Sequence, residues 1–295
     1  MSHSILKTPE ARSSIKVSII VPTYGRAEGL QKLIDSLRSS TPPDAYELVI
    51  VSSDPPDTAK AAWLRSLTDA RVIFADARQA WQLRKRSNYY YLNHAIKHSS
   101  YPWIFPLSDD MQVESGWYEA FLDVIKNPKH TNIGLIIAAS HVGNVQEGIR
   151  VDVIGRTKKP NAAWKLLYLS DVSIVRRDVM ESIGMFDEGM DWFGSGADLS
   201  LSVEFLTDTE TLPVETIRIH HTISRENRGT NMASAFSDFH YLLRKWDRWC
   251  REHDCRYEWD PGILPYTLQN RIANAIQQKI KIVRYYKNYF FKRRK

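Results

Sequence analysis

Short apolar runs alternate with longer amphipathic segments along the first part of the chain. The run KVSIIVP at 16–22 is rich in β-branched residues and predicts a strand, and apolar residues then recur at helical spacing over 30–37. The same order returns three times, with strands predicted at 46–52, 71–75 and 102–108 and a helical pattern after each. This alternation predicts an α/β fold with a mostly parallel central sheet flanked by helices, and ligands collect at the carboxyl ends of such strands.

The second half of the chain is less regular and becomes helical toward its end. Apolar runs predict further strands at 132–140, 171–177 and 213–221. From about residue 230 the pattern is helical, so the α/β fold carries a C-terminal helical extension. The predicted organisation is a flexible tail, an α/β domain and a helical extension, over 1–14, 15–228 and 229–295 respectively.

Composition indicates a folded protein with a buried core, since 43% of the 295 residues are hydrophobic. No window approaches the roughly 18 to 20 apolar residues that cross a bilayer, and the beginning of the sequence lacks the apolar stretch of a secretory signal. The two cysteines, Cys250 and Cys255, match neither a disulfide framework nor a zinc motif. We therefore expect a cytoplasmic protein in a reducing compartment.

The formal net charge of +6 comes from the end of the chain. Nine of the 40 basic residues and none of the 34 acidic residues follow Asp260, so that residues 1–260 carry 31 basic against 34 acidic groups. The stretch KIKIVRYYKNYFFKRRK mixes cations with aromatic residues and predicts peripheral binding to an anionic membrane surface, on its inner face. Nucleic acid is the less favoured partner of this tail, and a solvated helix is the remaining alternative.

An adjacent pair of carboxylates, Asp109 and Asp110, follows the strand predicted at 102–108 in FPLSDDMQVESGW. The sequence offers no basic neighbour, and two like charges sheltered from water repel each other unless a cation is present. Oxygen ligands of this kind suit Mn²⁺ or Mg²⁺, which bind one or two carboxylates and the phosphates of a substrate. The alternative is a capping role for the helix that begins near Gly116, since Asp is favoured at helix starts.

Four segments in order make the chain resemble the family 2 glycosyltransferases of the GT-A fold. They are VSIIVPTYGRAEGLQKLIDSL, YELVIVSSDPPD, WIFPLSDDMQVESGWYEAF and IGMFDEGMDWFGSGADLSLSVEF, and the resemblance covers roughly residues 15–225. It implies a Rossmann-like GT-A sheet and a metal-dependent, inverting transfer of a sugar from a nucleoside diphosphate, with UDP- or dTDP-sugars preferred. The implied acceptor is a hydroxyl of a glycan or of a lipid-linked sugar in polysaccharide or lipopolysaccharide biosynthesis.

The resemblance also implies a donor site. The last Asp of the family's D-x-D-type motif matches Asp110, which would hold the metal, and Asp109 would face the ribose. Ser52 and Ser53 replace the family's Asp pair after the second strand, so either Asp54 takes over base recognition or that recognition differs. The implied nucleotide-sugar contacts are Pro22, Thr23, Tyr24, Arg26, Asp54, Arg86, Asn88, Ser108 and Asp109.

Two further features of the implied donor site leave alternatives open. Family members often complete the metal site with a histidine near the end of the strand that here carries His220 and His221. Side chains alternate along a strand, so one of the two should face the site, and His221 is preferred. Arg86 is displaced by one position from the family's arginine before Asn88, and a solvated helix face is its alternative.

The catalytic base is where the chain departs from the family. Direct displacement at the anomeric carbon requires a carboxylate to take the proton of the acceptor hydroxyl. The family supplies it from a Glu-Asp motif that opens a helix, and a gapless match sets Ser195 and Gly196 at those positions. In the gapless match Asp198 takes the place of the motif's later Asp, and in a shifted match it takes the place of the base. Both matches retain Asp198, which is therefore the predicted base. Asp191 is the reserve, and a helix cap is the alternative role of Asp198.

The acceptor side and the overall function complete the set of predictions. The resemblance implies acceptor contacts from Asp187 and Trp192, with Phe186 in the core and aromatic core as the alternative for Trp192. Because the Glu-Asp and Asp-Asp motifs are altered, a GT-A-fold protein that binds a nucleotide or glycan without transferring it remains an alternative. A nucleic-acid-binding protein that acts through its basic tail is the other.

Overall fold

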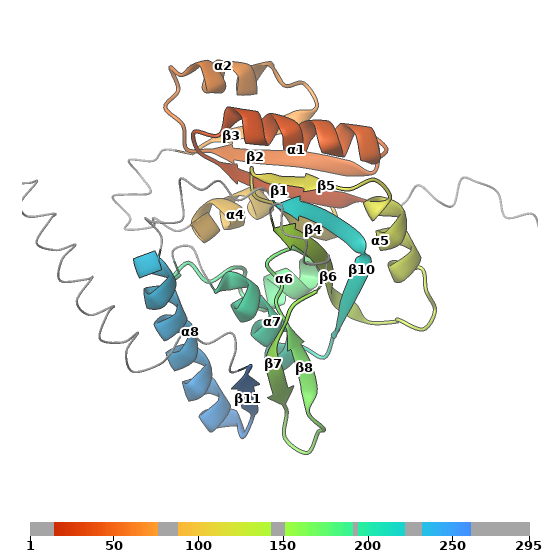
Figure 1. The fold of residues 1–295 in the computed structure, drawn as a ribbon, viewed down its shortest axis with the longest axis vertical. Helices are drawn as coiled ribbons and strands as arrows, with labels where there is room; N and C mark the ends of the chain where they lie inside the picture. The colour runs from red at the N-terminus through yellow and green to blue at the C-terminus, as the bar shows by residue number, and fades with distance from the viewer. Residues whose placement is uncertain (1–14, 76–87, 143–150, 191–193, 222–231, 261–295) are drawn as a thin grey trace, which may run out of the picture.

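The computed structural model describes residues 15–75, 88–142, 151–190, 194–221 and 232–260. Figure 1 shows a central sheet with helices on both of its faces. The predicted N-terminal tail and the basic aromatic stretch lie outside the described residues, as do Arg86, Asp191 and Trp192.

Within the described residues, eight strands form the central sheet in the order β3-β2-β1-β4-β9-β6-β10-β5. Six of them run in one direction: β1 (Val17–Thr23), β2 (Tyr46–Ser52), β3 (Ala70–Phe74), β4 (Trp103–Pro106), β6 (Ile133–Val142) and β10 (Glu210–His221). β9 (Ser173–Arg176) and β5 (Met111–Val113) run in the opposite direction. The predicted α/β fold with a mostly parallel sheet is confirmed. β5 was not predicted, because three residues are too few to show a periodic pattern.

Two groups of helices cover the two faces of this sheet (Figure 1). One face packs α1 (Ala27–Ser40), α2 (Ala59–Ser66) and α5 (Trp117–Ile125); the other packs α4 (Asn88–Lys97), α6 (Arg177–Ser182), α7 (Ser195–Leu206) and α8 (Met232–His253). Alternation along the strands explains the two layers, since Ile19 of β1 belongs to the first core and Ile20 to the second. The apolar stripe predicted over 30–37 is buried on the first face.

A second sheet of three strands lies beside the first and was not predicted from the sequence. It consists of β7 (Val153–Lys158), β8 (Lys165–Tyr168) and β11 (Arg256–Trp259), in the order β11-β7-β8. All its pairings are antiparallel, and β11 comes from the predicted extension while β7 comes from the predicted α/β domain. The division at residue 228 stays a prediction, although this sheet has strands from both sides of it.

Helix α8 shares a core with the elements that precede it. Leu242 and Trp246 are buried in the same cluster as Phe186 of the 183–190 segment and Ala197 of α7. The indole of Trp246 is 1% exposed, which makes it one of the largest fully buried side chains. The prediction that Phe186 is a core residue is confirmed.

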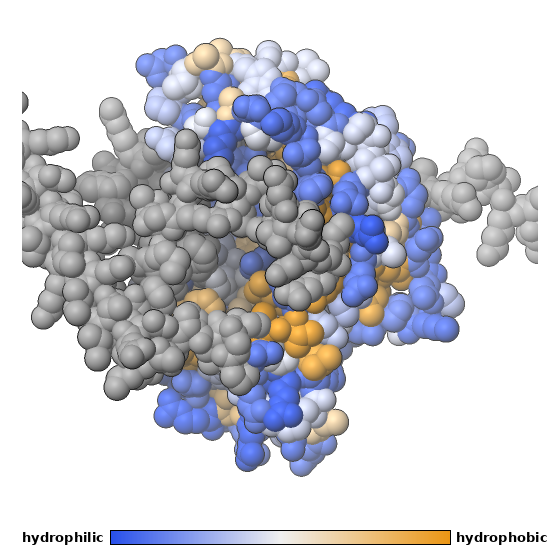
Figure 2. Space-filling view, viewed as in Figure 1, coloured by the Kyte–Doolittle hydropathy of each residue, from blue (hydrophilic) through white to orange (hydrophobic). Residues whose placement is uncertain are grey.

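On the face shown in Figure 2, much of the described surface is polar. In the space-filling view, hydrophilic residues occupy much of the outline and hydrophobic ones gather toward the middle of this face (Figure 2). Among the helices that the structure describes, none combines the length and apolar character needed to cross a membrane.

Glu47 of β2 fastens together the amino ends of three strands. Its carboxylate accepts hydrogen bonds from Ser18 Oγ of β1, at 2.6 Å, and from the backbone N–H groups of Ser100 and Tyr101, just before β4. Burial alone would raise the pKa of Glu47, but these hydrogen bonds outweigh it and hold the pKa below its ordinary value. The loops that follow these three strands begin at the opposite edge of the sheet. By holding the amino ends of the strands together, the Glu47 hydrogen bonds help to fix where those loops begin.

Replacing Glu47 by Gln should lower the free energy of unfolding by about 1 kcal/mol near neutral pH, because a partly exposed carboxylate loses its charge-assisted hydrogen bonds. Because the pKa of Glu47 is lower in the folded state than in the unfolded state, its contribution to stability is fully present above the unfolded-state pKa. That contribution is lost as the pH falls through the folded-state pKa. The deficit should therefore vanish well below the ordinary pKa of 4.5. Urea unfolding at both pH values checks this, with Glu119→Gln on the exposed side of α5 as the control. A deficit of equal size at both pH values would contradict it.

Candidate active site

The predicted site residues meet at the carboxyl ends of neighbouring strands. β1 ends at Thr23 and β2 at Ser52, the two strands pair in parallel, and β4 on the other side of β1 leads into Ser108, Asp109 and Asp110. Carboxyl ends of parallel strands lie at one edge of a sheet, so residues far apart in sequence become neighbours there.

Asp109 and Asp110 lie in the turn between β4 and β5, and both contact Arg26. The Arg26 guanidinium donates from Nη1 to Asp110 Oδ2 at 2.6 Å and to Asp109 Oδ1 at 3.2 Å. Thr23 Oγ1 donates to Asp109 Oδ2 at 2.7 Å, and Asp109 is only 6% exposed. The expectation that no basic residue stands near the pair is therefore wrong, because the cation arrives from the residue before α1, more than eighty positions earlier.

His221 reaches Asp110 through strand pairing. In the antiparallel pair of β10 and β5, His221 lies opposite Met111, the residue that follows Asp110. His221 Nε2 lies 3.3 Å from Asp110 Oδ1, whereas His220 is an exposed residue. Of the two histidines, His221 is thus the one beside the carboxylate pair.

The pair of atoms Asp110 Oδ1 and His221 Nε2 fits a divalent cation. Asp110 Oδ1 is buried and, within the described residues, has no hydrogen-bond partner despite its closeness to the imidazole. A carboxylate oxygen and an imidazole nitrogen are both ligands of Mn²⁺, and Mg²⁺ commonly relies on few protein ligands plus substrate phosphates. Among the described residues, no group of three or more His, Cys, Asp or Glu side chains could hold a metal ion.

The capping alternative for the carboxylate pair is wrong. Helix α5 begins after Gly116, whose backbone is left-handed with φ at 87°, and no side chain caps it. The carboxylates of Asp109 and Asp110 instead face Thr23, Arg26 and His221. Position 116 requires Gly because that backbone conformation strains other residues.

The two carboxylates have pKa values shifted in opposite directions. Burial raises the pKa of Asp109, and the hydrogen bond from Thr23 and the charge of Arg26 offset only part of the rise. Burial would also raise the pKa of Asp110, but the contact with His221 and the charge of Arg26 outweigh it and hold that pKa below its ordinary value. Adjacent groups that differ in this way are typical of functional sites.

A buried ion pair supports the turn from the side of β2. Lys60 of α2 donates to Thr23 Oγ1 at 2.7 Å and lies 2.8 Å from Asp54 Oδ2. Asp54 also accepts from Ser52 Oγ and from the backbone N–H of Gly25, both at 2.8 Å. Because both its oxygens are engaged, Asp54 holds the loop after β1 in place; its role in base recognition stays a prediction.

Lys60 was not among the predicted site residues. The sequence carries only a weak indication that Lys60 is buried. Lys60 is four residues before Leu64 and so lies on the same face of α2, and that face is buried. A buried lysine needs a carboxylate partner, and that partner could be identified only from the fold.

Gly29 lets α1 lie against the carboxylate turn. A Cβ atom at this position would come within 2.4 Å of the backbone oxygen of Asp109. The first turn of α1 therefore touches the main chain at Asp109, and this close approach brings Arg26 within reach of both carboxylates.

The remaining predicted donor contacts are placed around this turn. Pro22 is buried in β1, while the Tyr24 ring is 67% exposed just beyond it. Asn88 is the first residue of α4, and Ser108 is partly buried at the start of the turn. Their roles in nucleotide binding stay predictions.

The predicted base, Asp198, is engaged by α8. It is 4% exposed, Trp246 Nε1 donates to Asp198 Oδ1 at 2.7 Å, and Lys245 Nζ donates to Asp198 Oδ2 at 2.9 Å. Burial raises the pKa of Asp198, while Lys245 and Trp246 lower it in part. The capping alternative is wrong. Helix α7 begins after Gly194 without a side-chain cap, and the Asp198 side chain contacts α8 instead of the first N–H groups of α7.

Asp187, predicted to contact the acceptor, belongs to the same cluster. Lys245 Nζ donates to Asp187 Oδ2 at 2.8 Å, Tyr241 contributes its hydroxyl, and the backbone N–H of Gly189 donates to Asp187 Oδ1 at 2.9 Å. Burial would raise the pKa of Asp187, but these donors hold it below its ordinary value. Its acceptor role stays a prediction, and Lys245, which the sequence reasoning missed, joins Asp187 and Asp198 to α8.

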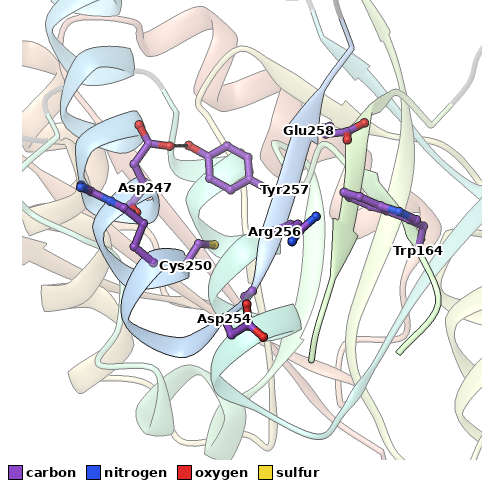
Figure 3. Close-up of a pocket in the computed structure, with 9 residues that line it drawn as sticks. Trp164, Asp247, Cys250, Asp254, Arg256, Tyr257 and Glu258 are labelled. Atoms are coloured by element: carbon purple, nitrogen blue, oxygen red, sulfur yellow. Dashed lines mark hydrogen bonds between the residues drawn. The ribbon is translucent and has the colours of Figure 1, made fainter. Parts of the chain in front are cut away.

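A separate hollow of about 680 Å³ lies along α8 and β11. Figure 3 shows Asp247, Cys250 and Tyr257 on one side of it and Trp164 on the other. None of the predicted site residues lines it, so it is distinct from the carboxylate turn.

Comparison with known proteins identifies the family. The family model described as Glycosyl transferase family 2 matches residues 18–184, more than half of the chain. O-antigen biosynthesis protein RfbC of Myxococcus xanthus is 28% identical over 230 residues, which are 71% of this chain and 18% of RfbC. The chain therefore spans less than a fifth of the length of this relative.

Solved glycosyltransferase structures share the fold. S. aureus TarS 1-349 in complex with UDP-GlcNAc has a TM-score of 0.59 at 16% identity, covering 78% of this chain and 65% of that one. The mannosyltransferase PcManGT from Pyrobaculum calidifontis, in complex with GDP-Man and Mn²⁺, has a TM-score of 0.54 at 14% identity, covering 80% and 66%. These likenesses confirm the predicted GT-A fold.

Replacing Lys60 by Met should lower the free energy of unfolding by about 3 kcal/mol, because Asp54 would be left buried without its cation. The double variant Asp54→Asn/Lys60→Met should recover part of this loss, since it removes both charges. Urea unfolding of the four proteins of this cycle measures the coupling. Lys32→Met removes an exposed lysine of α1 and should change stability little. Additive losses in the double variant would contradict the prediction.

Proposed function

The chain belongs to glycosyl transferase family 2, and on that premise we propose that it transfers a sugar, with inversion, from a nucleotide-sugar donor to an acceptor hydroxyl. The observation that carries the proposal is the turn after β4, where two carboxylates from one strand end meet Arg26 and His221. A site that brings cationic and metal-binding groups together at the carboxyl edge of such a sheet suits a diphosphate.

On the donor side, Asp109 binds the ribose and the exposed ring of Tyr24 packs on the nucleobase. The exposure of Tyr24 supports this role, because a large aromatic side chain open to solvent beside polar groups is suited to stacking. Pro22, Thr23, Asn88 and Ser108 border the same edge and belong to the proposed contact surface. UDP- and dTDP-sugars are the first donors to test, although PcManGT was solved with GDP-Man.

A divalent cation, Mn²⁺ or Mg²⁺, is held in this proposal by Asp110 and His221. The unpartnered Oδ1 of Asp110, 3.3 Å from the imidazole, supports that role. When bound, the cation supplies positive charge that stabilises the departing diphosphate. Arg26, whose guanidinium already contacts both carboxylates, adds a second positive group at the same place.

The acceptor in this proposal is a hydroxyl of a glycan or of a lipid-linked sugar. The match to a protein named for O-antigen biosynthesis supports polysaccharide biosynthesis as the setting. Asp187 and Trp192 remain the proposed acceptor contacts. The basic aromatic tail would bring the enzyme to the cytoplasmic face of a membrane that carries such acceptors.

Calorimetric titration of UDP, dTDP, GDP and CMP, with and without Mn²⁺, tests the donor site. We expect one nucleotide to bind in a Mn²⁺-dependent manner, and its affinity to fall by about 100-fold or more in Asp110→Asn, since loss of a metal ligand should cost at least as much as loss of a group that orients one. Asp123→Asn, which removes an exposed carboxylate of α5, is the matched control and should bind as the wild type does.

Three results of this titration separate the alternatives. Failure of every nucleotide to bind, with or without the metal, would overturn the proposed function. Nucleotide binding that is unaffected by Mn²⁺ but is lost in Arg26→Met would overturn the metal dependence. It would show that Arg26, rather than a metal ion, balances the charge of the diphosphate. Metal-dependent binding of a nucleotide, together with no release of that nucleotide from its sugar nucleotide in a separate turnover assay, would favour the non-transferring nucleotide-binding protein.

Association with a membrane has its own test. Replacing Lys292, Arg293, Arg294 and Lys295 together by Gln should weaken binding of the full chain to phosphatidylserine-containing vesicles, because each cation contributes about 1 kcal/mol near an anionic surface. Sedimentation with vesicles at two salt concentrations measures it. Equal sedimentation of the two proteins would contradict a role for these charges.

A further inference from the structure

The proposed transfer needs a base, and the two matches to the family's motif differ on where that base lies. In the gapless match Ser195 and Gly196 stand where the family carries its Glu-Asp pair, and neither has a carboxylate. In the shifted match Asp198 is the base. Asp198, the nearest acidic residue on α7, is buried and has both oxygens in contact with Lys245 or Trp246. A base must be free to accept a proton from the acceptor, so these contacts argue against Asp198 in that role.

The topology places Asp171 at the same edge of the sheet as the carboxylate turn. Asp171 precedes β9, which runs antiparallel to its neighbours, so the amino end of β9 lies beside the carboxyl ends of β4 and β6. In the β4–β9 pair Ile104 lies opposite Val175, and continuing this register sets Asp171 at the level of Ser108. On the other side, the backbone N–H of Ala138 in β6 donates to the carbonyl of Val172.

The carboxylate of Asp171 is available for chemistry. The residue keeps contact with solvent although protein atoms surround its carboxylate closely, and within the described part of the chain no group donates a hydrogen bond to that carboxylate. The acidic side chains of Asp54, Asp109, Asp187 and Asp198, by contrast, are all held by hydrogen bonds.

The charges around Asp171 link it to the donor site. Desolvation by surrounding protein raises the pKa of Asp171, the charge of His221 works against that rise, and Asp152 adds to it. His221 is also the residue beside Asp110. A raised pKa brings a carboxylate closer to the range in which a general base works best.

The Asp171 segment occupies the space that a side chain at position 196 would need, and in the gapless match position 196 carries the motif's Asp. A Cβ atom at position 196 would come within 2.2 Å of Asp171 Oδ1 and within 2.6 Å of the Asp171 backbone nitrogen. Ser170 Oγ also donates to the carbonyl of Gly196 at 2.5 Å, which fixes the two segments together. No side chain fits at 196, and the carboxylate nearest to that position now comes from the segment before β9.

We propose that Asp171 is the general base of the transfer reaction, in place of the family's Glu-Asp carboxylate; this rests on the proposed function. Asp171 takes the proton of the acceptor hydroxyl while the acceptor oxygen forms its bond to the anomeric carbon. The bond from that carbon to the diphosphate oxygen breaks, and its electron pair leaves with the nucleoside diphosphate. Charge balance requires nothing else, since the proton stays on Asp171 until it passes to water.

The test compares binding and turnover in Asp171→Asn. Turnover is followed as release of nucleoside diphosphate from UDP-N-acetylglucosamine or GDP-mannose, with water as the acceptor. We expect Asp171→Asn to lower the release rate by about 100-fold or more, the usual contribution of a general base, while the dissociation constant of the nucleotide stays within about twofold. Its melting temperature should not fall below that of the wild type, because the replaced carboxylate has no hydrogen bond to lose and the amide has the same shape.

The controls distinguish the two proposals. Asp123→Asn should release nucleotide at the wild-type rate. If wild type and Asp171→Asn both turn over at similar rates, Asp171 is not the base, and the proposed function stands. If Asp198→Asn loses turnover while still folded and Asp171→Asn does not, Asp198 is the base. If Asp171→Asn loses nucleotide binding, the residue acts in the donor site and the assignment is overturned. A wild type that binds nucleotide and never releases it from a sugar nucleotide also overturns the assignment of a base.

Discussion

Burial of two adjacent carboxylates is the constraint on which the rest of the site depends. Asp109 and Asp110 repel each other, and beside the hydrophobic end of β4 they have little contact with water that could screen their charges. Arg26 contacts both, Thr23 donates to one, and His221 lies beside the other. The stability of this turn therefore requires three other segments of the chain to be in place at once.

The same requirement extends outward as a continuous series of polar contacts. Thr23 receives a hydrogen bond from Lys60, and Lys60 is paired with Asp54, which in turn fixes Gly25. In this series each charged side chain contacts one of opposite sign, as burial of charge requires. The loop that carries Tyr24 and Arg26 is thus held at both ends before any substrate arrives, and such preorganisation lowers the cost of binding a charged donor.

Two short antiparallel strands give the parallel sheet its asymmetry. β5 pairs with β10 and brings His221 to Asp110. β9 lies between β4 and β6, and its amino end, with Asp171 two positions before the strand, lies at the same edge. A purely parallel sheet would present only carboxyl ends at that edge. On the far side, Lys245 and Trp246 of α8 engage Asp187 and Asp198, so residues that look catalytic in sequence join the helix to the body of the protein.

The sequence by itself determined the alternation of strands and helices, the apolar stripe of α1, the family, and the position of the carboxylate pair. Periodicity and the order of motifs can be read along the chain without knowing which strands become neighbours in the sheet. It did not reveal β5, nor β7, β8 and β11 of the second sheet, which are too short or irregular to show a period, nor the cation that contacts the carboxylate pair. Arg26 and Lys245 each lie far from their carboxylates in sequence, Lys60 is separated from Asp54 by the loop between β2 and α2, and Asp171 carries no motif. Only the tertiary structure decided which charges are paired, because pairing follows from the order of strands in the sheet and from burial, and neither can be read along a single chain.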